Sequence, residues 1–247
     1  MRTLTWDGCV NVRDLGGHAT EDGRVTRFGR VVRADSVRRL SDDGWKALTE
    51  YGVRTVVDLR YQVELDRDPP RDVDLDVVHI SLFGEPDEER WAELEELGTA
   101  QGDAPGFTRV IYLEVLEEHR AKLAEAVAAV GHAAAGGVVV HCHAGKDRTG
   151  LVTALLLRLA GVPIEEVSLD YAQSERHLAV RNKEWIAEGA DEAERDWRRL
   201  VTSTPAEGMR GVLEEIDRRY GDVASYLRAG GAADADLDAA QARLLDD

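Results

Sequence analysis

Short apolar runs rich in β-branched residues alternate, in the first part of the chain, with segments whose apolar positions recur at helical spacing. Four segments fit strands that are buried on one or both faces: residues 30–33, 55–59, 76–82 and 138–141. Between the first two, residues 41–48 begin with a serine that can cap a helix and end near Gly52. This alternation predicts an α/β fold, in which a central, mainly parallel sheet of four or more strands is flanked by helices.

Helical periodicity dominates the rest of the chain. Residues 105–132 have apolar residues at helical spacing, which predicts one long helix or two. Beyond residue 161 the pattern is helical almost throughout, and we expect helices at residues 163–178, 205–220 and 222–228. The 247 residues are predicted to form a single domain, 1–247, with a helical C-terminal portion of about residues 161–247.

Acidic residues are concentrated in residues 85–96 and 234–247. Runs of like charge usually face solvent, so we expect these stretches to form a solvated face or a frayed tail. The acidic, glycine-containing stretches 85–106 and 188–194 are candidates for a mobile cover over a functional site. The tryptophans are expected to pack in the core or between helices; they are residues 6, 45, 91, 185 and 197.

The chemistry of the chain is concentrated between Cys142 and Arg148, just after the apolar run that ends at His141 and just before a predicted helix that begins near Thr149. Free N–H groups at a helix N-terminus, with the positive end of the helix dipole, bind anions. The same field favours a thiolate over a thiol at Cys142. Arg148 adds a planar fork of donors that can bind two phosphate oxygens. The spacing therefore predicts a phosphate-binding loop with a cysteine nucleophile.

The string HCHAGKDRTG at residues 141–150 resembles the phosphate loop of the bacterial tyrosine-protein phosphatases of the Tyr/Ser, triple-specificity type, within the Cys-x5-Arg superfamily. Three other segments are similar to that family, in the same order along the chain: NVRDLGG at 11–17, VVDLR at 56–60 and YGDVASYL at 220–227. The resemblance implies a cysteine-phosphatase-like fold and a phosphomonoesterase that acts on phosphotyrosine, and also on phosphoserine and phosphothreonine, through a cysteinyl-phosphate. A phosphoinositide phosphatase and a non-catalytic phospho-ligand binding module are the alternatives.

The loop residues divide into several expected roles. Seven residues are expected to bind the phosphate: His143, Ala144, Gly145, Lys146, Asp147, Arg148 and Thr149. The Thr149 hydroxyl could also donate to the departing thiolate, and His141 could order the loop. Lys146 brings a second cation to the mouth of the site, which suits a substrate with several phosphates or with acidic neighbours. The family resemblance suggests that Asn11 or Arg13 orders the loop.

Two aspartates are candidates for the proton donor to the leaving oxygen. Asp147 is the first candidate, because an adjacent dianionic phosphate favours its protonated form. Asp58 is the second, because it ends a predicted strand at the edge where ligands bind in open α/β sheets. Asp147 could instead orient Arg148, and Asp58 could instead pair with Arg60 or with an N-terminal arginine.

The net charge of −17 disfavours nucleic acid and stable association with anionic membranes. Four arginines could still approach the site if their strands end at that edge: Arg33, Arg38, Arg39 and Arg60. We expect a phosphoprotein or a phospholipid headgroup as substrate, and neither a metal nor an organic cofactor, since the histidines lack ligand spacing. With no signal peptide or membrane-spanning run, a cytoplasmic protein is expected, although leaderless secretion and the oligomeric state stay open.

Overall fold

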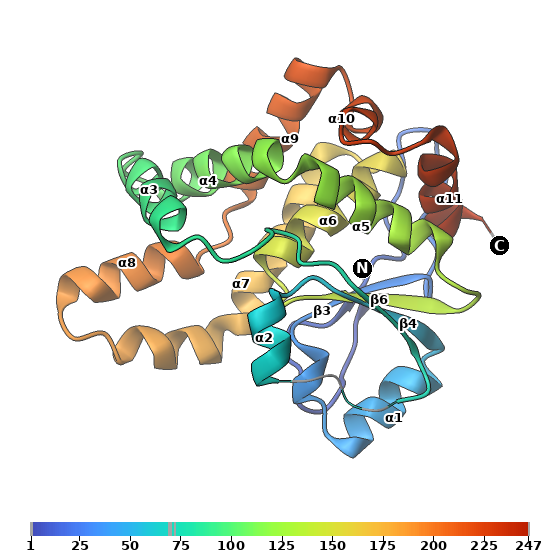
Figure 1. Ribbon diagram of the computed structural model, residues 1–247, viewed down its shortest axis with the longest axis horizontal. Helices are drawn as coiled ribbons and strands as arrows, with labels where there is room; N and C mark the ends of the chain where they lie inside the picture. Colours follow the sequence, from blue (N-terminus) through green and yellow to red (C-terminus); the bar gives the residue numbers. More distant parts are fainter. Residues whose placement is uncertain (1, 69–70, 72, 247) are drawn as a thin grey trace.

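The computed structural model describes residues 2–68, 71 and 73–246, and its centre is a six-stranded sheet (Figure 1). The strands lie in the order β1-β2-β3-β6-β4-β5. Along the chain they are β1 (Arg2–Thr3), β2 (Arg13–Asp14), β3 (Val31–Ala34), β4 (Val53–Asp58), β5 (Asp76–His79) and β6 (Gly137–His141). β3, β6, β4 and β5 are parallel, whereas β1 and β2 add antiparallel pairs at one edge. The predicted α/β fold with a mainly parallel sheet is confirmed.

Both faces of the sheet are buried, because the valines of its central strands alternate between two hydrophobic cores. Val138 and Val140 of β6 pack into the larger core, and Val139 packs into the smaller core on the opposite face. Successive side chains of a strand point to opposite faces, so a strand that is covered on both faces has an almost continuous apolar sequence. This double burial explains the run of valines that precedes His141.

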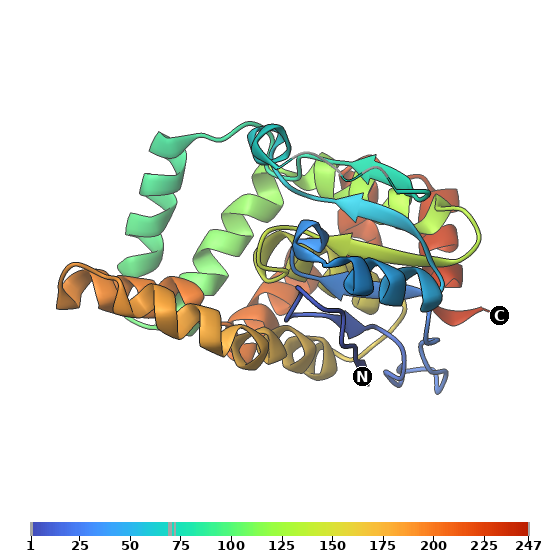
Figure 2. The ribbon, with the colours of Figure 1, turned by 90° about the horizontal axis from the view of Figure 1, so that it is seen from below.

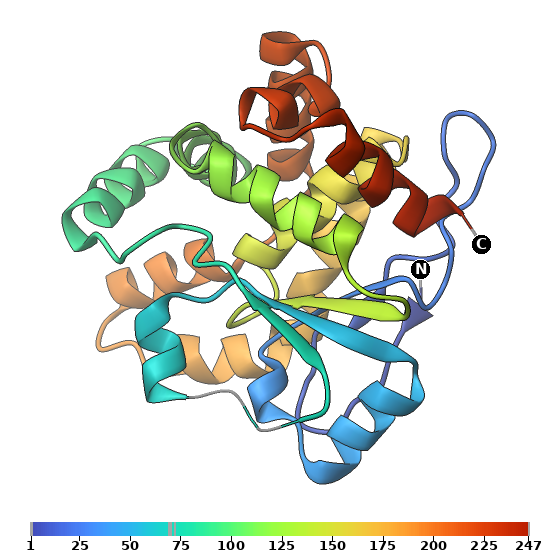
Figure 3. The same ribbon diagram turned by 45° about the vertical axis from the view of Figure 1, so that its right-hand side comes forward.

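Helices cover the two faces of the sheet (Figure 3). One face is covered by α1 (Asp42–Glu50), whose predicted cap Ser41 accepts a hydrogen bond from the Gly44 N–H. The other face is covered by α5 (Arg120–His132) and α6 (Asp147–Leu159). Two further helices pack on this layer: α10 (Val223–Ala229) and α11 (Asp234–Leu245). The strand β6 and the helix α6, which flank the predicted phosphate loop, are therefore at the centre of the molecule.

A group of four helices extends to one side of the sheet (Figure 2). They are α3 (Glu88–Thr99), α4 (Ala104–Glu118), α7 (Ile164–Ala187) and α8 (Glu192–Thr202). The pair α3–α4 lies across from the pair α7–α8, and α9 (Ala206–Tyr220) packs against both α4 and α7. None of the helices in the described part of the chain combines the length and the apolar character that a membrane span requires.

Most predicted helices are present with somewhat different ends. The segment 105–132 forms two helices, α4 and α5, which meet at His119. The helix expected at residues 163–178 continues to Ala187 as α7. The last predicted helices correspond to α9 and α10, so the helical C-terminal portion is confirmed.

Of the two alternatives expected for the acidic stretches, the structure shows the solvated face of packed helices. Residues 234–245 do not form a frayed tail, because α11 packs against α5 and buries Leu237, Ala240 and Leu244. These residues recur at helical spacing, so the acidic side chains occupy the solvent-facing side of a packed helix. The stretch 85–96 contains most of α3, which is also packed, with Leu94 buried.

Candidate active site

The loop that joins β6 to α6 lies at the carboxyl edge of the parallel strands. Cys142 follows β6 directly and is only 2% exposed. Asp147 begins α6, two residues earlier than the sequence suggests, and Arg148 follows it in the first turn. The predicted order of strand, loop and helix is confirmed, and the 13-residue helix α6 directs its N-terminus at the loop.

Hydrogen bonds from outside the loop hold its carbonyl groups. The carbonyl oxygen of His143 accepts from the Ser36 N–H at 3.1 Å, and that of Ala144 accepts from Asn11 Nδ2 at 2.9 Å. The carbonyl oxygen of Gly145 accepts from Asn11 Nδ2 at 3.2 Å and from Arg33 Nη2 at 2.8 Å. In a trans peptide the N–H group points away from the C=O group, so the following N–H groups turn toward the concave side of the loop. These belong to Ala144, Gly145 and Lys146, and they bond to nothing in the described chain. Such a row of N–H groups is an anion-binding cradle.

A buried network of charges supports this arrangement from behind. Arg13 donates to the Asn11 side-chain oxygen, and both Arg13 and Arg33 form ion pairs with Asp170 of α7. Burial alone would raise the pKa of Asp170, but the two arginines outweigh it and lower the pKa to about 2. Asn11 therefore orders the loop directly, whereas Arg13 acts through Asn11.

Arg148 is fixed by two residues at the start of α2 (Gln62–Arg67), the N-cap Tyr61 and Glu64. The Glu64 carboxylate accepts from Arg148 Nη1 at 2.5 Å, and the Tyr61 ring lies 5.0 Å from the guanidinium carbon. Burial would lower the pKa of Arg148, but the Cys142 sulfur and Glu64 outweigh it and raise the pKa. Arg148 therefore stays charged beside the loop, with Glu64 as its anchor.

Asp147 lies at the junction between the loop and a cleft. Its Oδ1 accepts a hydrogen bond from the Tyr112 hydroxyl at 2.7 Å, and Lys146 Nζ lies 3.0 Å from the same oxygen. The Tyr171 hydroxyl lies 2.9 Å from that of Tyr112. Lys146 also donates to the carbonyl oxygen of Val201, at the end of α8, at 2.6 Å. Lys146 therefore binds protein groups and does not project freely from the mouth of the site.

Asp58 lies behind the loop. Its carboxylate is buried and accepts hydrogen bonds from Arg60 at 3.0 Å (Nε to Oδ1) and 2.8 Å (Nη2 to Oδ2). The His141 Nε2 atom lies 3.5 Å from Oδ2, while His141 Nδ1 lies 3.2 Å from the Cys142 carbonyl oxygen. Burial raises the pKa of Asp58, but His141 and Arg60 outweigh it and lower the pKa. Asp58 thus pairs with Arg60, which is one of the alternatives that the sequence left open.

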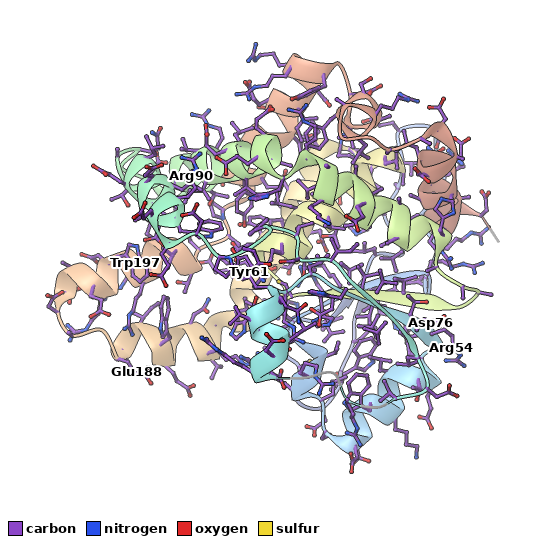
Figure 4. The ribbon with its side chains drawn as sticks, in the orientation of Figure 1. Arg54, Tyr61, Asp76, Arg90, Glu188 and Trp197 are labelled. Carbon is purple, nitrogen blue, oxygen red and sulfur yellow. The ribbon has the colours of Figure 1, made fainter. Side chains whose placement is uncertain are left out.

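A cleft of about 400 Å³ opens beside Asp147 and Arg148. Its walls are mainly aromatic and aliphatic, and they come from α4, from α7, from the end of α8 and from the segments around α2 and α3. They include Tyr61, Phe83, Trp91, Phe107, Ile111, Val115, Trp185 and Leu200. Figure 4 shows Tyr61 beside α2 and Trp197 where α8 faces α3. Trp91 and Trp185 line this cleft and also pack between helices, as expected, against Phe83 and Trp197 respectively. Trp91 and Glu95, from the stretch 85–106, line the cleft, whereas the stretch 188–194 leads into α8, which begins at Glu192.

The comparisons with known proteins agree with this geometry. A sequence profile of the tyrosine phosphatase family matches residues 4–246. The chain belongs to this family. A tyrosine-protein phosphatase of Nostoc commune is 32% identical over 228 residues, which cover 86% of this chain and 73% of that protein. The triple specificity protein phosphatase PtpB of Mycobacterium tuberculosis is 29% identical, over 96% of this chain and 97% of its own.

As a tyrosine phosphatase, the protein has site residues that sequence reasoning did not find. Glu64 binds Arg148, Tyr112 binds Asp147, and Asp170 neutralises the arginines behind the loop. Glu64 also accepts the Tyr61 N–H at 2.9 Å and thereby caps α2, which is a local signal that the sequence could have given. Among the residues that the structure describes, no group of three His, Cys, Asp or Glu side chains could hold a metal ion.

Proposed function

We propose that this tyrosine phosphatase hydrolyses phosphotyrosine in proteins through a cysteinyl-phosphate on Cys142. The observation that supports this best is the loop from Cys142 to Arg148, where three consecutive carbonyls are held outward and the intervening N–H groups face inward beside a buried cysteine. Such donors bind the phosphate oxygens and hold the phosphorus in line with the sulfur. They also stay in place as charge develops in the transition state.

In the first step the Cys142 thiolate attacks the phosphorus, so that the S–P bond forms and the P–O ester bond breaks. Arg148 binds the equatorial oxygens, and Asp147 gives its proton to the leaving oxygen. Tyr112 and Lys146 both contact Oδ1 of Asp147, which leaves Oδ2 for the proton. We assign the acid to Asp147 because it lines the cleft, whereas Asp58 is buried against Arg60.

In the second step a water molecule attacks the phosphorus and gives its proton to Asp147, while the S–P bond breaks. The products are inorganic phosphate and the Cys142 thiolate. The Thr149 hydroxyl is buried in the first turn of α6 and has no hydrogen-bond partner among the described residues. It supplies the hydrogen bond that stabilises the departing thiolate.

The aromatic cleft favours phosphotyrosine over shorter side chains, because a phenyl ring gains apolar burial against walls such as Tyr61 and Phe107. Phosphoserine and phosphothreonine lack this ring, so we expect slower turnover, in keeping with the relative that is named a triple specificity phosphatase. A phosphoinositide headgroup is a polar ring that gains little from these apolar walls, and Lys146 at the cleft already binds Asp147 and the Val201 carbonyl. The lipid is therefore the weaker candidate.

The first test is hydrolysis of para-nitrophenyl phosphate, a phosphotyrosine peptide, the matching phosphoserine peptide and a soluble phosphoinositide by the wild type and by Cys142→Ser. We expect the phosphotyrosine peptide to have the highest kcat/KM of the physiological substrate types, and Cys142→Ser to abolish every activity. If folded, reduced wild type turns over none of them while phosphate protects Cys142 from alkylation, a non-catalytic phosphate-binding module replaces the proposal.

The second test separates the two aspartates by leaving group. Asp147→Asn is expected to slow phenyl phosphate hydrolysis about 10²-fold, and para-nitrophenyl phosphate much less, because a good leaving group needs little proton donation. Asp58→Asn should affect both substrates alike, since its side chain acts through Arg60 and His141. The opposite pattern would transfer the acid role to Asp58.

A further inference from the structure

The cations around the phosphate loop are almost all neutralised by carboxylates of the chain. The pairs are Arg33 with Asp170, Arg60 with Asp58, Lys146 with Asp147 and Arg148 with Glu64. Arg39 is the exception, because it forms no ion pair with any residue in the described part of the chain. The sequence has 48 acidic residues against 31 lysines and arginines, so a cation without a carboxylate beside the loop indicates a position for an external anion.

The backbone holds Arg39 at the rim of the loop. Arg39 ends the short 3₁₀ helix η1 (Val37–Arg39), which follows β3 at the carboxyl edge of the sheet. The Ser36 N–H donates to the carbonyl oxygen of His143 at 3.1 Å, and the Arg39 N–H donates to the carbonyl oxygen of Ser36 at 3.0 Å. These bonds tie η1 to the phosphate loop and fix the base of the Arg39 side chain.

Arg39 and His143 form an exposed pair of nitrogen donors. Arg39 Nη2 lies 3.2 Å from His143 Nε2, and both side chains are exposed. Burial lowers the pKa of His143 and Arg39 lowers it further, so the imidazole is neutral at pH 7 and can accept the Arg39 hydrogen bond. Among the described residues, the carboxylate nearest to this ring is that of Glu64, 3.8 Å from Nδ1, and Glu64 is already bound to Arg148.

Arg39 and His143 lie outside the cleft. The cleft is lined by Asp147 and Arg148 together with apolar side chains, and neither Arg39 nor His143 contributes to its walls. A substrate whose phosphate occupies the loop therefore meets two separate surfaces, the apolar wall of the cleft and the Arg39 cation. An extended peptide can present an aromatic residue and a neighbouring side chain to these two surfaces.

We propose that Arg39, supported by His143, is a subsite for a carboxylate next to the phosphorylated residue of an acidic phosphopeptide. This subsite rests on the proposed phosphatase function. The substrate carboxylate supplies the ion pair that Arg39 lacks within the chain, and the guanidinium fork can bind both of its oxygens. Lys146, which the sequence suggests for acidic neighbours, is engaged by Val201 and Asp147.

The test compares two phosphotyrosine peptides that differ only in whether acidic residues or alanines flank the phosphotyrosine. The wild type is expected to have the higher kcat/KM for the acidic peptide. Arg39→Ala should lower the ratio of acidic to neutral kcat/KM about fivefold at low salt, since exposed ion pairs are modest and screened. Arg39→Glu should invert the preference toward a lysine-flanked peptide. The matched control is Arg54→Ala, which removes the same charge from an exposed residue at the far end of the sheet from Tyr61 (Figure 4).

The outcomes separate the subsite from the activity. A ratio that is the same in Arg39→Ala as in the wild type, while Cys142→Ser abolishes turnover, overturns the subsite and leaves the phosphatase intact. A similar fall in Arg54→Ala also overturns the subsite, because it would show a long-range effect of net charge. If Arg39→Ala lowers kcat/KM only for a soluble inositol bisphosphate, the occupant is a second phosphate and the peptide proposal is overturned. No turnover by the wild type would overturn the proposed function itself.

Discussion

Replacing Gly145 by alanine tests whether the phosphate loop is as tightly packed as the structure indicates. Gly145 has a φ of +67°, and a Cβ atom there would lie 2.5 Å from the carbonyl oxygen of Ala34. An ordinary contact begins near 3.4 Å, so the loop must move by about 1 Å away from the end of β3. A left-handed alanine adds a strain of about 1 kcal/mol. The Ala34 carbonyl belongs to the backbone at the end of a buried strand and cannot move aside, so the loop must move instead.

A displacement of about 1 Å in a catalytic group can cost about 10²-fold in rate, and we expect Gly145→Ala to lower kcat/KM for para-nitrophenyl phosphate by about that factor. Inorganic phosphate should also become a weaker competitive inhibitor, because the same N–H groups bind it. The unfolding free energy, measured in urea, should fall by about 3 kcal/mol, from strain and overpacking together.

The control is Gly23→Ala. Gly23 has a φ of +86°, and a Cβ atom added there would have no other atom within 4 Å, so the substitution brings the backbone strain without the collision. We expect it to lose about 1 kcal/mol of stability and no activity. If Gly145→Ala keeps kcat/KM within about threefold of the wild type while Gly23→Ala behaves as expected, the rigid packing of the loop against β3 is refuted.

Three further predictions concern single contacts. Tyr112→Phe removes the hydroxyl that holds Asp147, so it should slow poor leaving groups about tenfold more than good ones; equal losses would contradict this. Glu64→Ala should lower kcat about tenfold by releasing Arg148, and Glu64→Gln should lower it less, because the amide oxygen still accepts; equal kcat values for the two variants would argue against the anchor. Burial raises the pKa of Asp170, but two arginines lower it to about 2, so its charge contributes about 2 kcal/mol of stability above pH 4 that is lost as the pH falls toward 2. The difference in unfolding free energy between the wild type and Asp170→Asn, measured in urea, should therefore decrease over this pH range. A constant difference would disprove the assignment.

The elements that sequence patterns predicted well are those with a strong local signal. The valine run before His141 indicated a strand that is buried on both faces, and the Ser41 cap marked the start of α1. The spacing from Cys142 to Arg148 identified the phosphate loop because the chemistry of an anion site requires these residues between a strand and a helix. Such signals depend on neighbours in sequence, which are visible without the fold.

The residues that sequence patterns missed are those whose partners come from distant parts of the chain. Asp170 is one acid among many on an amphipathic helix, and only the packing of α7 brings it to Arg33. Trp91 has the spacing of a core residue, and its place in the cleft depends on how α3 lies across from α8. The acidic composition of α11 concealed its apolar side, since charge and helical periodicity gave opposing indications.

Because residues outside the loop hold its carbonyl groups, the loop sequence alone is not enough to build this site in another protein. The ten-residue string contains the nucleophile and the arginine, but the groups that shape it come from residues 11, 33 and 36, and the charge that balances them comes from residue 170. A designed scaffold that received the string alone would gain a reactive thiol without an oriented row of donors. During synthesis on the ribosome, too, the loop would emerge well before Asp170, so a nascent chain acquires a competent site only after α7 has been made and has docked.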